Sequence, residues 1–294
     1  MRIVSLLPST TEILFDIGAG DDVVGVTFEC DHPVEARSRT IVSTSALPEG
    51  LTPQAIDAYV ADAMRKGDDL YHLDEGALSG LDADLVVTQD LCAVCAVDVS
   101  VVDDALAHLG CTAEVLTIDP HTLDEVLASV ETLGRATGNE HRAAELAASL
   151  RHRLDDVVRR TTGLSRTRTL VLEWTEPPFA PGHWVPEMVD LAGGTSVLGT
   201  VGAASHRVSW DDVRHAAPEV VVCAPCGYGL DQSRELAHEV ARSGQLPDDV
   251  AIWAVDANAS FARPGPRLVD GVEALAGILH PDMMPRSGIS DRVR

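Results

Sequence analysis

Basic residues, and lysine above all, are scarce in this sequence. Its 294 residues include 22 Lys+Arg against 46 Asp+Glu, which gives a formal net charge of −24, and Lys66 is the single lysine. Proteins grip nucleic acids through clustered Lys and Arg, so this deficit argues against a nucleic-acid partner. With 45% hydrophobic and 23% charged residues, the composition is that of a globular chain rather than a disordered one.

Long apolar runs are missing as well. No stretch of about 18 apolar residues occurs, so we expect no insertion into a membrane. Met1 and Arg2 lead straight into Ile3–Leu7, an apolar segment too short to be the hydrophobic region of a secretory signal. The sequence as written predicts a cytoplasmic protein, and the alternative is export if a targeting segment has been removed.

Common catalytic signatures are absent where they would be expected. The turn after Ile3–Leu7 reads Pro8-Ser9-Thr10-Thr11 and lacks the spaced glycines of a phosphate-binding or dinucleotide-binding loop. The G-x-S-x-G motif of a nucleophile elbow is also missing. We therefore expect a protein that binds a ligand without transforming it.

Strand-like and helix-like segments alternate along the chain. Leu85–Thr88 is a short run of buried, mostly β-branched character, whereas residues 52–65 carry apolar side chains at helical spacing. Strands separated by helices favour parallel pairing with right-handed crossovers. The pattern predicts an α/β fold with parallel sheets.

The order of predicted strands and loops in the first part of the chain is repeated in the second part. The strand Ile3–Leu7 with its proline-containing turn corresponds to Leu170–Trp174, which the proline-rich loop Glu176–His183 follows. Ala83–Val87 likewise corresponds to Ala217–Val222, and each precedes a loop with cysteine. Such an internal duplication predicts two similar lobes.

We accordingly expect two Rossmann-like lobes with parallel sheets, joined by a long central helix. The N-terminal α/β lobe would comprise residues 1–121, a helical connector residues 122–163, and the C-terminal α/β lobe residues 164–294.

Aromatic residues are few, yet they fall on loops that follow predicted strands. They make up 4% of the chain, and the loop members are Trp174, Phe179, Trp184, Tyr228 and Phe261. In open parallel sheets these outgoing loops form the binding edge, so we expect loops of both lobes to line one cleft. Planar aromatic walls suit a flat macrocycle. The alternative is that these rings fill the seam between the lobes.

Two polar residues on the same loops are further candidates for ligand contacts. His183 lies between Gly182 and Trp184, and its imidazole could reach a corrinoid cobalt or a haem iron. Arg263 shares a loop with Phe261 and could hold a carboxylate or phosphate of the ligand.

The cysteines suggest a second hypothesis. Cys223 falls inside a predicted strand and is expected in the core, whereas Cys30, Cys92, Cys95 and Cys226 fall on loops. Four thiolates that converge would suit zinc or an iron–sulfur cluster, in a cytosolic metal protein or enzyme. The alternative is that these small side chains never meet.

Three segments resemble a known family. They are residues 2–9, residues 177–194 with their PPF, PEM and LAGG motifs, and residues 261–267. These segments look like those of BtuF-type cobalamin-binding proteins of the class III periplasmic-binding group. The similarity covers nearly the whole chain. The resemblance implies two lobes bridged by a rigid helix, a small-molecule metal chelate such as cobalamin as ligand, and an ABC importer permease as partner.

Within that group the sequence is most similar to a branch without signal peptides, through Glu29–Asp31, Gln89–Cys92 and Gly182–Trp184. The matching segments add Ser9 and Glu29 to the expected contacts. The predicted ligand-binding residues are Ser9, Glu29, Trp174, Phe179, His183, Trp184, Tyr228, Phe261 and Arg263, with cobalamin or a related corrinoid as cofactor.

Overall fold

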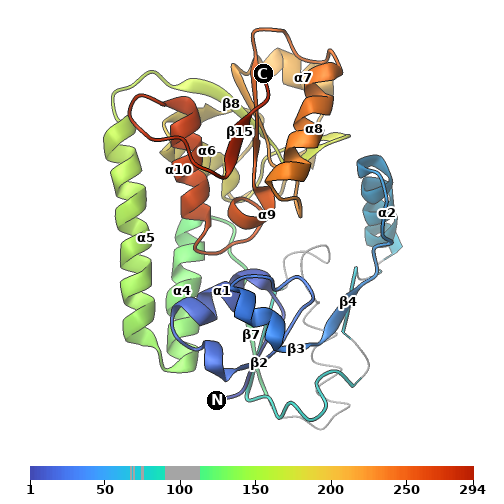
Figure 1. Ribbon diagram of the computed structural model, residues 1–294, viewed down its shortest axis with the longest axis vertical. Coiled ribbons are helices and arrows are strands. Elements are labelled where there is room, and N and C mark those ends of the chain that lie inside the picture. Colours follow the sequence, from blue (N-terminus) through green and yellow to red (C-terminus); the bar gives the residue numbers. More distant parts are fainter. Residues whose placement is uncertain (67, 69, 74–75, 90–112) are drawn as a thin grey trace. The chain divides into compact units, whose positions relative to one another are not determined.

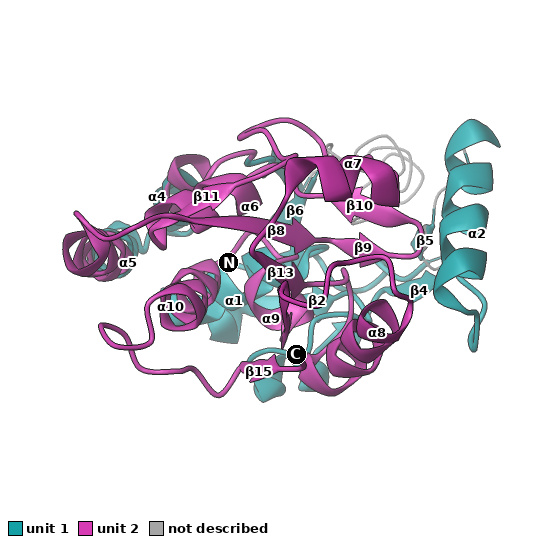
Figure 2. Cartoon of the chain, turned by 90° about the horizontal axis from the view of Figure 1, so that it is seen from above, with its two compact units in different colours: residues 1–120, 128–147 teal, residues 121–127, 148–294 magenta. Residues whose placement is uncertain are grey.

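The computed structural model describes residues 1–66, 68, 70–73, 76–89 and 113–294. Its contacts divide the chain into two compact units, which Figure 2 shows in different colours. Unit 1 comprises Met1–Pro120 and Ala128–Ala147, and unit 2 comprises His121–Leu127 and Ala148–Arg294. The expected connector, residues 122–163, forms two helices that contribute residues to both units, α4 (Leu123–Thr137) and α5 (Glu140–Thr161).

The sheet of unit 1 is parallel throughout. Its strand order is β3-β2-β1-β6-β7. The strands are β1 (Ile3–Ser5), β2 (Val23–Val26), β3 (Thr40–Ile41), β6 (Leu85–Thr88) and β7 (Glu114–Thr117) (Figure 1). The central strand β1 is fully buried, as its apolar sequence predicts.

The helices of unit 1 cover this sheet with apolar side chains. α1 (Pro8–Asp16) begins with proline, which fits the first helical turn because its missing N–H has no partner there. Ile13 and Ile17 pack with Val130 of α4 and Ala143 of α5 in one buried cluster. Unit 1 also contains α2 (Pro53–Lys66) and the antiparallel pair β4 (Ser43–Ser45) and β5 (Tyr71–Leu73).

Unit 2 has a second five-stranded sheet, in the order β11-β8-β13-β14-β15. The strands are β8 (Thr167–Leu172), β11 (Gly194–Ser196), β13 (Val220–Cys223), β14 (Ala251–Val255) and β15 (Ser290–Arg292). The first four are parallel, and the C-terminal strand β15 pairs antiparallel with β14. Cys223 is buried within this sheet, which confirms its expected place in the core.

The remaining elements of unit 2 are five helices and a small antiparallel sheet. The helices are α6 (Val185–Leu191), α7 (Trp210–Ala216), α8 (Leu230–Arg242), α9 (Ala257–Ser260) and α10 (Leu268–Leu279). The small sheet consists of β9 (Trp174–Thr175), β10 (Pro178–Ala180) and β12 (His206–Arg207). The loop expected over Glu176–His183 thus includes a strand, because Phe179 pairs with both Trp174 and Arg207.

The two sheets have the same core order, which agrees with the predicted duplication. β2-β1-β6-β7 in unit 1 corresponds to β11-β8-β13-β14 in unit 2, and all the pairings within these sets are parallel. The expected α/β fold with parallel sheets is therefore confirmed. An equal order also means that the loops after β1 and β8, and those after β6 and β13, occupy equivalent positions.

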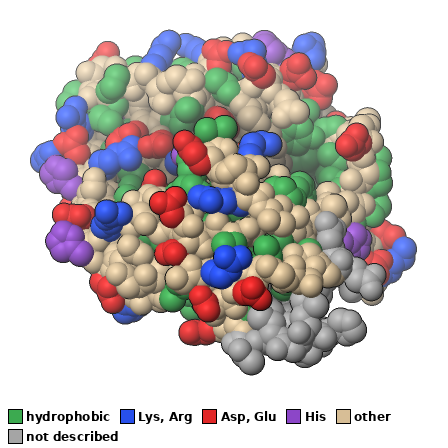
Figure 3. Space-filling view, turned by 60° about the horizontal axis from the view of Figure 1, so that its bottom comes forward, with side chains coloured by type: hydrophobic (Ala, Val, Ile, Leu, Met, Phe, Trp, Pro, Cys, Tyr) green, Lys and Arg blue, Asp and Glu red, His purple; other side chains and the backbone are tan. Residues whose placement is uncertain are grey.

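Acidic and basic side chains are interspersed on the face that Figure 3 shows. Among the described residues, no helix combines the length and the apolar character that a membrane crossing requires.

Candidate ligand-binding site

Strands β8 and β13 place their outgoing segments side by side at one edge of the unit 2 sheet. Leu172 pairs with Cys223 at the end of both strands. Just beyond, the Cys226 backbone N–H donates to the Glu173 carbonyl over 3.1 Å. The two loops therefore leave the sheet together, as parallel pairing requires.

Two predicted aromatic residues meet at this edge. The rings of Trp174 and Tyr228 lie 5.6 Å apart between centroids and are tilted by 47°. The Trp174 indole N–H donates to the Glu176 carbonyl over 3.1 Å, which fixes the orientation of the ring. Both residues retain partial exposure. Burial raises the pKa of Tyr228 above its usual value, so its phenol stays neutral at physiological pH.

Phe179 lies on β10 directly across from Trp174. It is partly exposed, and the Arg207 guanidinium lies 5.8 Å from its ring centroid. A cation over an aromatic face is held by the ring quadrupole and stabilises the orientation of both groups. Trp174, Tyr228 and Phe179 thus form a partly exposed aromatic group at the β9–β10 end of unit 2, which we call the aromatic edge.

His183 occupies an unusual backbone conformation next to this group in sequence. Its φ is +49°, in the left-handed region that non-glycine residues rarely adopt. Its N–H donates to the Ala203 carbonyl over 2.6 Å, and its carbonyl accepts the Gly202 N–H over 2.9 Å. A Cβ on Gly182 would collide with the backbone of Ser205. The loop is therefore clamped from both sides, and strain held in this way is typical of functional positions.

Two rings of the described residues lie near that of His183. The His121 imidazole lies 5.9 Å away and the Trp184 indole 5.5 Å away, between centroids. His121 precedes α4, and Glu125 accepts its backbone N–H over 2.6 Å. We did not predict His121 as a site residue. Its position was a usable signal, because His121 lies four residues after the carboxyl end of β7.

Three other predicted residues are enclosed within unit 2. Trp184, Phe261 and Arg263 are 5%, 2% and 8% exposed, respectively. The Trp184 indole N–H donates to the Phe261 carbonyl over 2.8 Å. This hydrogen bond joins the His183 loop to the segment after α9, and the partly exposed side chains of the candidate site are those of the aromatic edge and His183.

A buried carboxylate lies beneath the His183 loop. Glu173 Oε1 accepts the Gly182 N–H over 2.9 Å, and the Ser205 side chain is a second hydrogen-bond partner. The residue is partly exposed, but its carboxylate points inward, and burial raises its pKa to about 7. Sequence alone does not single out Glu173, because acidic residues are abundant throughout the chain.

In the described part of unit 1, short polar side chains contact one another at the corresponding edge of the sheet. Ser5 Oγ lies 2.7 Å from Thr10 Oγ1 and accepts the Thr11 hydroxyl over 2.8 Å. Cys30 Sγ lies 3.2 Å from both Thr11 Oγ1 and Thr27 Oγ1. Cys30 is 1% exposed and belongs to the apolar core cluster. Of the two residues predicted to contact ligand in unit 1, Ser9 is buried on α1 and Glu29 is partly exposed.

The four cysteines predicted to bind metal are placed only in part. Cys92 and Cys95 lie outside the described residues. Cys30 is buried among hydroxyl groups, whereas Cys226 is exposed beside Tyr228. In the described part of the chain, no group of three or more His, Cys, Asp and Glu side chains is arranged to hold a metal ion.

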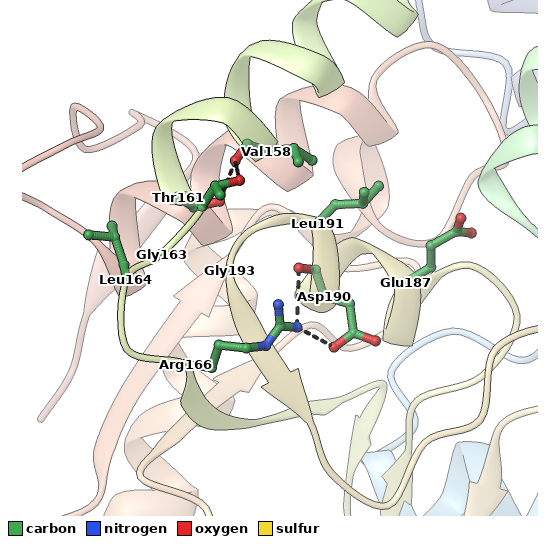
Figure 4. A pocket seen from close by; sticks show the side chains of 10 residues that line it. Val158, Thr161, Gly163, Leu164, Arg166, Glu187, Asp190, Leu191 and Gly193 are labelled. Atoms are coloured by element: carbon green, nitrogen blue, oxygen red, sulfur yellow. Dashed lines mark hydrogen bonds and ion pairs between the residues drawn. The ribbon is translucent and has the colours of Figure 1, made fainter.

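A cavity of about 370 Å³ lies elsewhere in unit 2, between the end of α5 and the end of α6 (Figure 4). Val158, Leu164 and Leu191 contribute apolar surface to it. Arg166 donates to the Asp190 carboxylate over 2.9 Å at its rim. None of the residues predicted to contact ligand lines this cavity.

Comparison with known proteins identifies relatives of the whole chain. The family model described as "Periplasmic binding protein" matches residues 3–244. An uncharacterized ABC transporter substrate-binding lipoprotein, YvrC of Bacillus subtilis, is 27% identical over 96% of this chain and 80% of its own length. The vitamin B12-binding protein of Vibrio cholerae is 25% identical over 95% of this chain and 88% of its own.

A solved structure has a similar fold. The periplasmic heme binding protein of Pseudomonas aeruginosa superimposes with a TM-score of 0.72 at 18% identity, covering 100% of this chain and 98% of that one. At this identity the likeness concerns the fold alone.

Proposed function

Since the chain belongs to the periplasmic binding protein family, we propose that it binds a corrinoid or a related metal-containing tetrapyrrole at the aromatic edge of unit 2, without catalysis. The observation that carries the proposal is the aromatic edge, with Trp174 and Tyr228 rings 5.6 Å apart. Flat, partly exposed aromatic surface favours a flat conjugated ligand.

His183 is the group that we propose to face the metal of the ligand. It lies on a clamped loop and is partly exposed. A neutral imidazole nitrogen binds cobalt and iron well, whereas the raised pKa of Tyr228 disfavours a phenolate ligand. His121, whose ring neighbours that of His183, would restrict the orientation of the imidazole. Cobalamin and haem share this chemistry, so the distinction between them belongs to the experiment.

The relatives support a role in import. One is named as an ABC transporter substrate-binding lipoprotein, and others as vitamin B12-binding or periplasmic heme binding proteins. We propose that the chain delivers its ligand to an ABC importer permease outside the cytoplasm. These names favour the exported alternative over the cytoplasmic location that the sequence as written predicts.

Equilibrium dialysis against cyanocobalamin, cobinamide and haem tests the proposal. We expect at least one of them to bind at micromolar concentration. Trp174→Leu should weaken that binding by about fivefold, since stacked aromatic contacts contribute on the order of 1 kcal/mol each. Trp210→Leu is the matched control, because Trp210 is also partly exposed in unit 2 but packs at α7.

Binding of none of the three ligands would overturn the tetrapyrrole proposal. Where a ligand does bind, the visible spectrum of its complex tests whether His183 coordinates the metal. We expect the wild type to show the spectrum of a histidine-bound metal and His183→Asn to lose it. An unchanged spectrum in that variant would show that the metal is held in another way.

A further inference from the structure

The start of α4 is attached to the His183 loop and the helix that follows it at two points. The His121 ring lies 5.9 Å from the His183 ring between centroids. Leu123, the first residue of α4, donates its backbone N–H to Glu187 Oε2 over 3.0 Å. Glu187 belongs to the first turn of α6, four residues after His183. A ring contact and a hydrogen bond therefore hold two short stretches together that are distant in sequence.

The Glu187 side chain is directed away from the ion pair at the rim of the cavity (Figure 4). That pair joins Arg166 to Asp190, which lies three residues further along α6. Glu187 instead reaches the start of α4, where a carboxylate is favoured by the positive end of the helix dipole. Leu123 is 3% exposed, so an N–H left without its acceptor there would be costly.

The two preceding N–H groups at the start of α4 have an acceptor within the same turn. The Glu125 carboxylate accepts the backbone N–H groups of His121 and Thr122, over 2.6 and 3.2 Å. Thr122 Oγ1 accepts the Glu125 N–H in turn, over 3.3 Å. Such reciprocal bonds form a capping box, which is sufficient to begin a helix. The bond from Leu123 to Glu187 therefore constrains where the start of α4 lies, rather than whether the helix forms.

This constraint acts on the one part of His183 that its loop leaves free. The His183 backbone is fixed by its hydrogen bonds to Ala203 and Gly202, so the torsions of its side chain are the remaining freedom. A neighbouring ring held beside the imidazole restricts those torsions. A side chain that is ordered before binding saves the conformational entropy that binding would otherwise cost.

We propose that Glu187 is a positioning residue, which holds the start of α4 so that the His121 ring keeps the His183 imidazole in the orientation that meets the metal of the ligand. The statement about the ligand rests on the proposed function, whereas the statement about the two rings does not. Loss of this hold should weaken binding of a metal-containing ligand by about three- to fivefold, which corresponds to the ordering of one side chain.

Nuclear magnetic resonance of the ligand-free protein tests the positioning role directly. In Glu187→Ala we expect the Overhauser contact between the His121 and His183 rings to disappear and the Leu123 amide to exchange about tenfold faster. Glu187→Gln should restore both signals, because its amide oxygen accepts the same hydrogen bond. Asp190→Ala is the matched control, since it removes a carboxylate of the same helix that pairs with Arg166, and it should behave as the wild type.

An intact contact between the two rings in Glu187→Ala would overturn the positioning role. If that variant does not fold, Glu187→Asp serves instead, because it keeps the charge and withdraws the carboxylate by one methylene group. Loss of the ring contact is again the expected result, and its retention would overturn the role equally.

Equilibrium dialysis against haem and cyanocobalamin at one fixed pH tests the route to the ligand. The wild type is compared with Glu187→Ala, His121→Ala and the double variant. Because Glu187 acts through His121 in this proposal, the double variant should bind no more weakly than His121→Ala. Additive losses would overturn that route, and equal affinity of all four proteins would overturn the link to the ligand.

The two experiments fail independently. Absence of binding of both ligands to the wild type would overturn the proposed function, while the ring contact in the ligand-free protein still decides the role of Glu187.

Discussion

The two units share one strand order and differ in what they place at the carboxyl edge of the sheet. In the described part of unit 1, Ser5, Thr10, Thr11, Thr27 and Cys30 satisfy one another in a buried network. In unit 2 the same edge presents partly exposed aromatic rings and a clamped histidine.

This difference shows that the strand order and the side chains at the loop edge vary independently. Equal β-strand pairing fixes where the loops emerge, but the loop side chains decide whether that edge carries an internal hydrogen-bond network or partly exposed rings. We therefore expect changes in unit 2 to affect both stability and binding, and changes in the unit 1 network to affect stability alone.

The largest effect is expected for Trp184→Ala. This side chain is 5% exposed and donates to Phe261, so its removal should lower the free energy of unfolding by about 3–5 kcal/mol, as for other buried aromatic residues. Urea denaturation followed by circular dichroism provides the measurement. Trp184→Phe should lose less, since it retains most of the packing. An unchanged denaturation midpoint for the alanine variant would show that the ring does not support the His183 loop.

Gly182→Ala should have the next largest effect. The added Cβ would collide with the Ser205 nitrogen and approach the Ala203 carbonyl oxygen, and overpacking of this kind costs about 1–3 kcal/mol. We expect a lower thermal midpoint and weaker ligand binding. Gly229→Ala is the control, because a Cβ there meets nothing within 4 Å. Equal behaviour of the two variants would contradict the clamped geometry.

Thr11→Val tests whether the unit 1 network contributes to stability but not to ligand binding. The variant keeps the shape but removes a hydroxyl that contacts Ser5, the Leu7 carbonyl and Cys30. Loss of these buried hydrogen bonds should reduce the free energy of unfolding by about 1–2 kcal/mol. Ligand affinity should stay within about twofold of the wild type. A loss of affinity comparable to that of Trp174→Leu would place the unit 1 network in the binding site.

The smallest expected effect is the pH dependence of stability caused by Glu173. Its folded pKa, about 7, lies above the ordinary value of 4.5, so the folded state binds the proton more tightly than the unfolded state does. This stabilisation is fully present below about 4.5 and is lost as the pH rises through about 7.

Relative to the wild type, Glu173→Gln should therefore gain stability between pH 5 and pH 8. We expect a gain of about 1 kcal/mol, because solvent screening of this partly exposed residue reduces the full effect. Thermal midpoints at both pH values check it.

Much of the fold was predictable from periodicity, because strands and helices here follow the apolar pattern closely. Leu85–Thr88 was expected with the bounds that β6 has, and Cys223 was expected inside a strand, where it ends β13. Strand β10 was not expected within the loop Glu176–His183, since its pairing with β9 and β12 depends on residues distant in sequence.

The candidate site was predictable only by location. The rule that loops after parallel strands meet at one edge of the sheet predicted that Trp174 and Tyr228 lie close together, and the structure has their rings in contact. It did not distinguish these partly exposed rings from Trp184 and Phe261, which are buried and joined by a hydrogen bond from the indole N–H to the Phe261 carbonyl. Exposure depends on how the loops fold back onto the unit, and no local pattern encodes that.

The sequence by itself determined the alternation of strands and helices, the repetition of the plan, and the class of residues that follow each strand, because these depend on local periodicity and spacing. Tertiary structure alone decided that Cys30 lies among hydroxyl groups, that His183 is left-handed beside His121, and that the Glu173 carboxylate is buried under a loop. Burial and hydrogen-bond partners arise from contacts between distant segments, and it is these contacts that set the charge and orientation of a functional group.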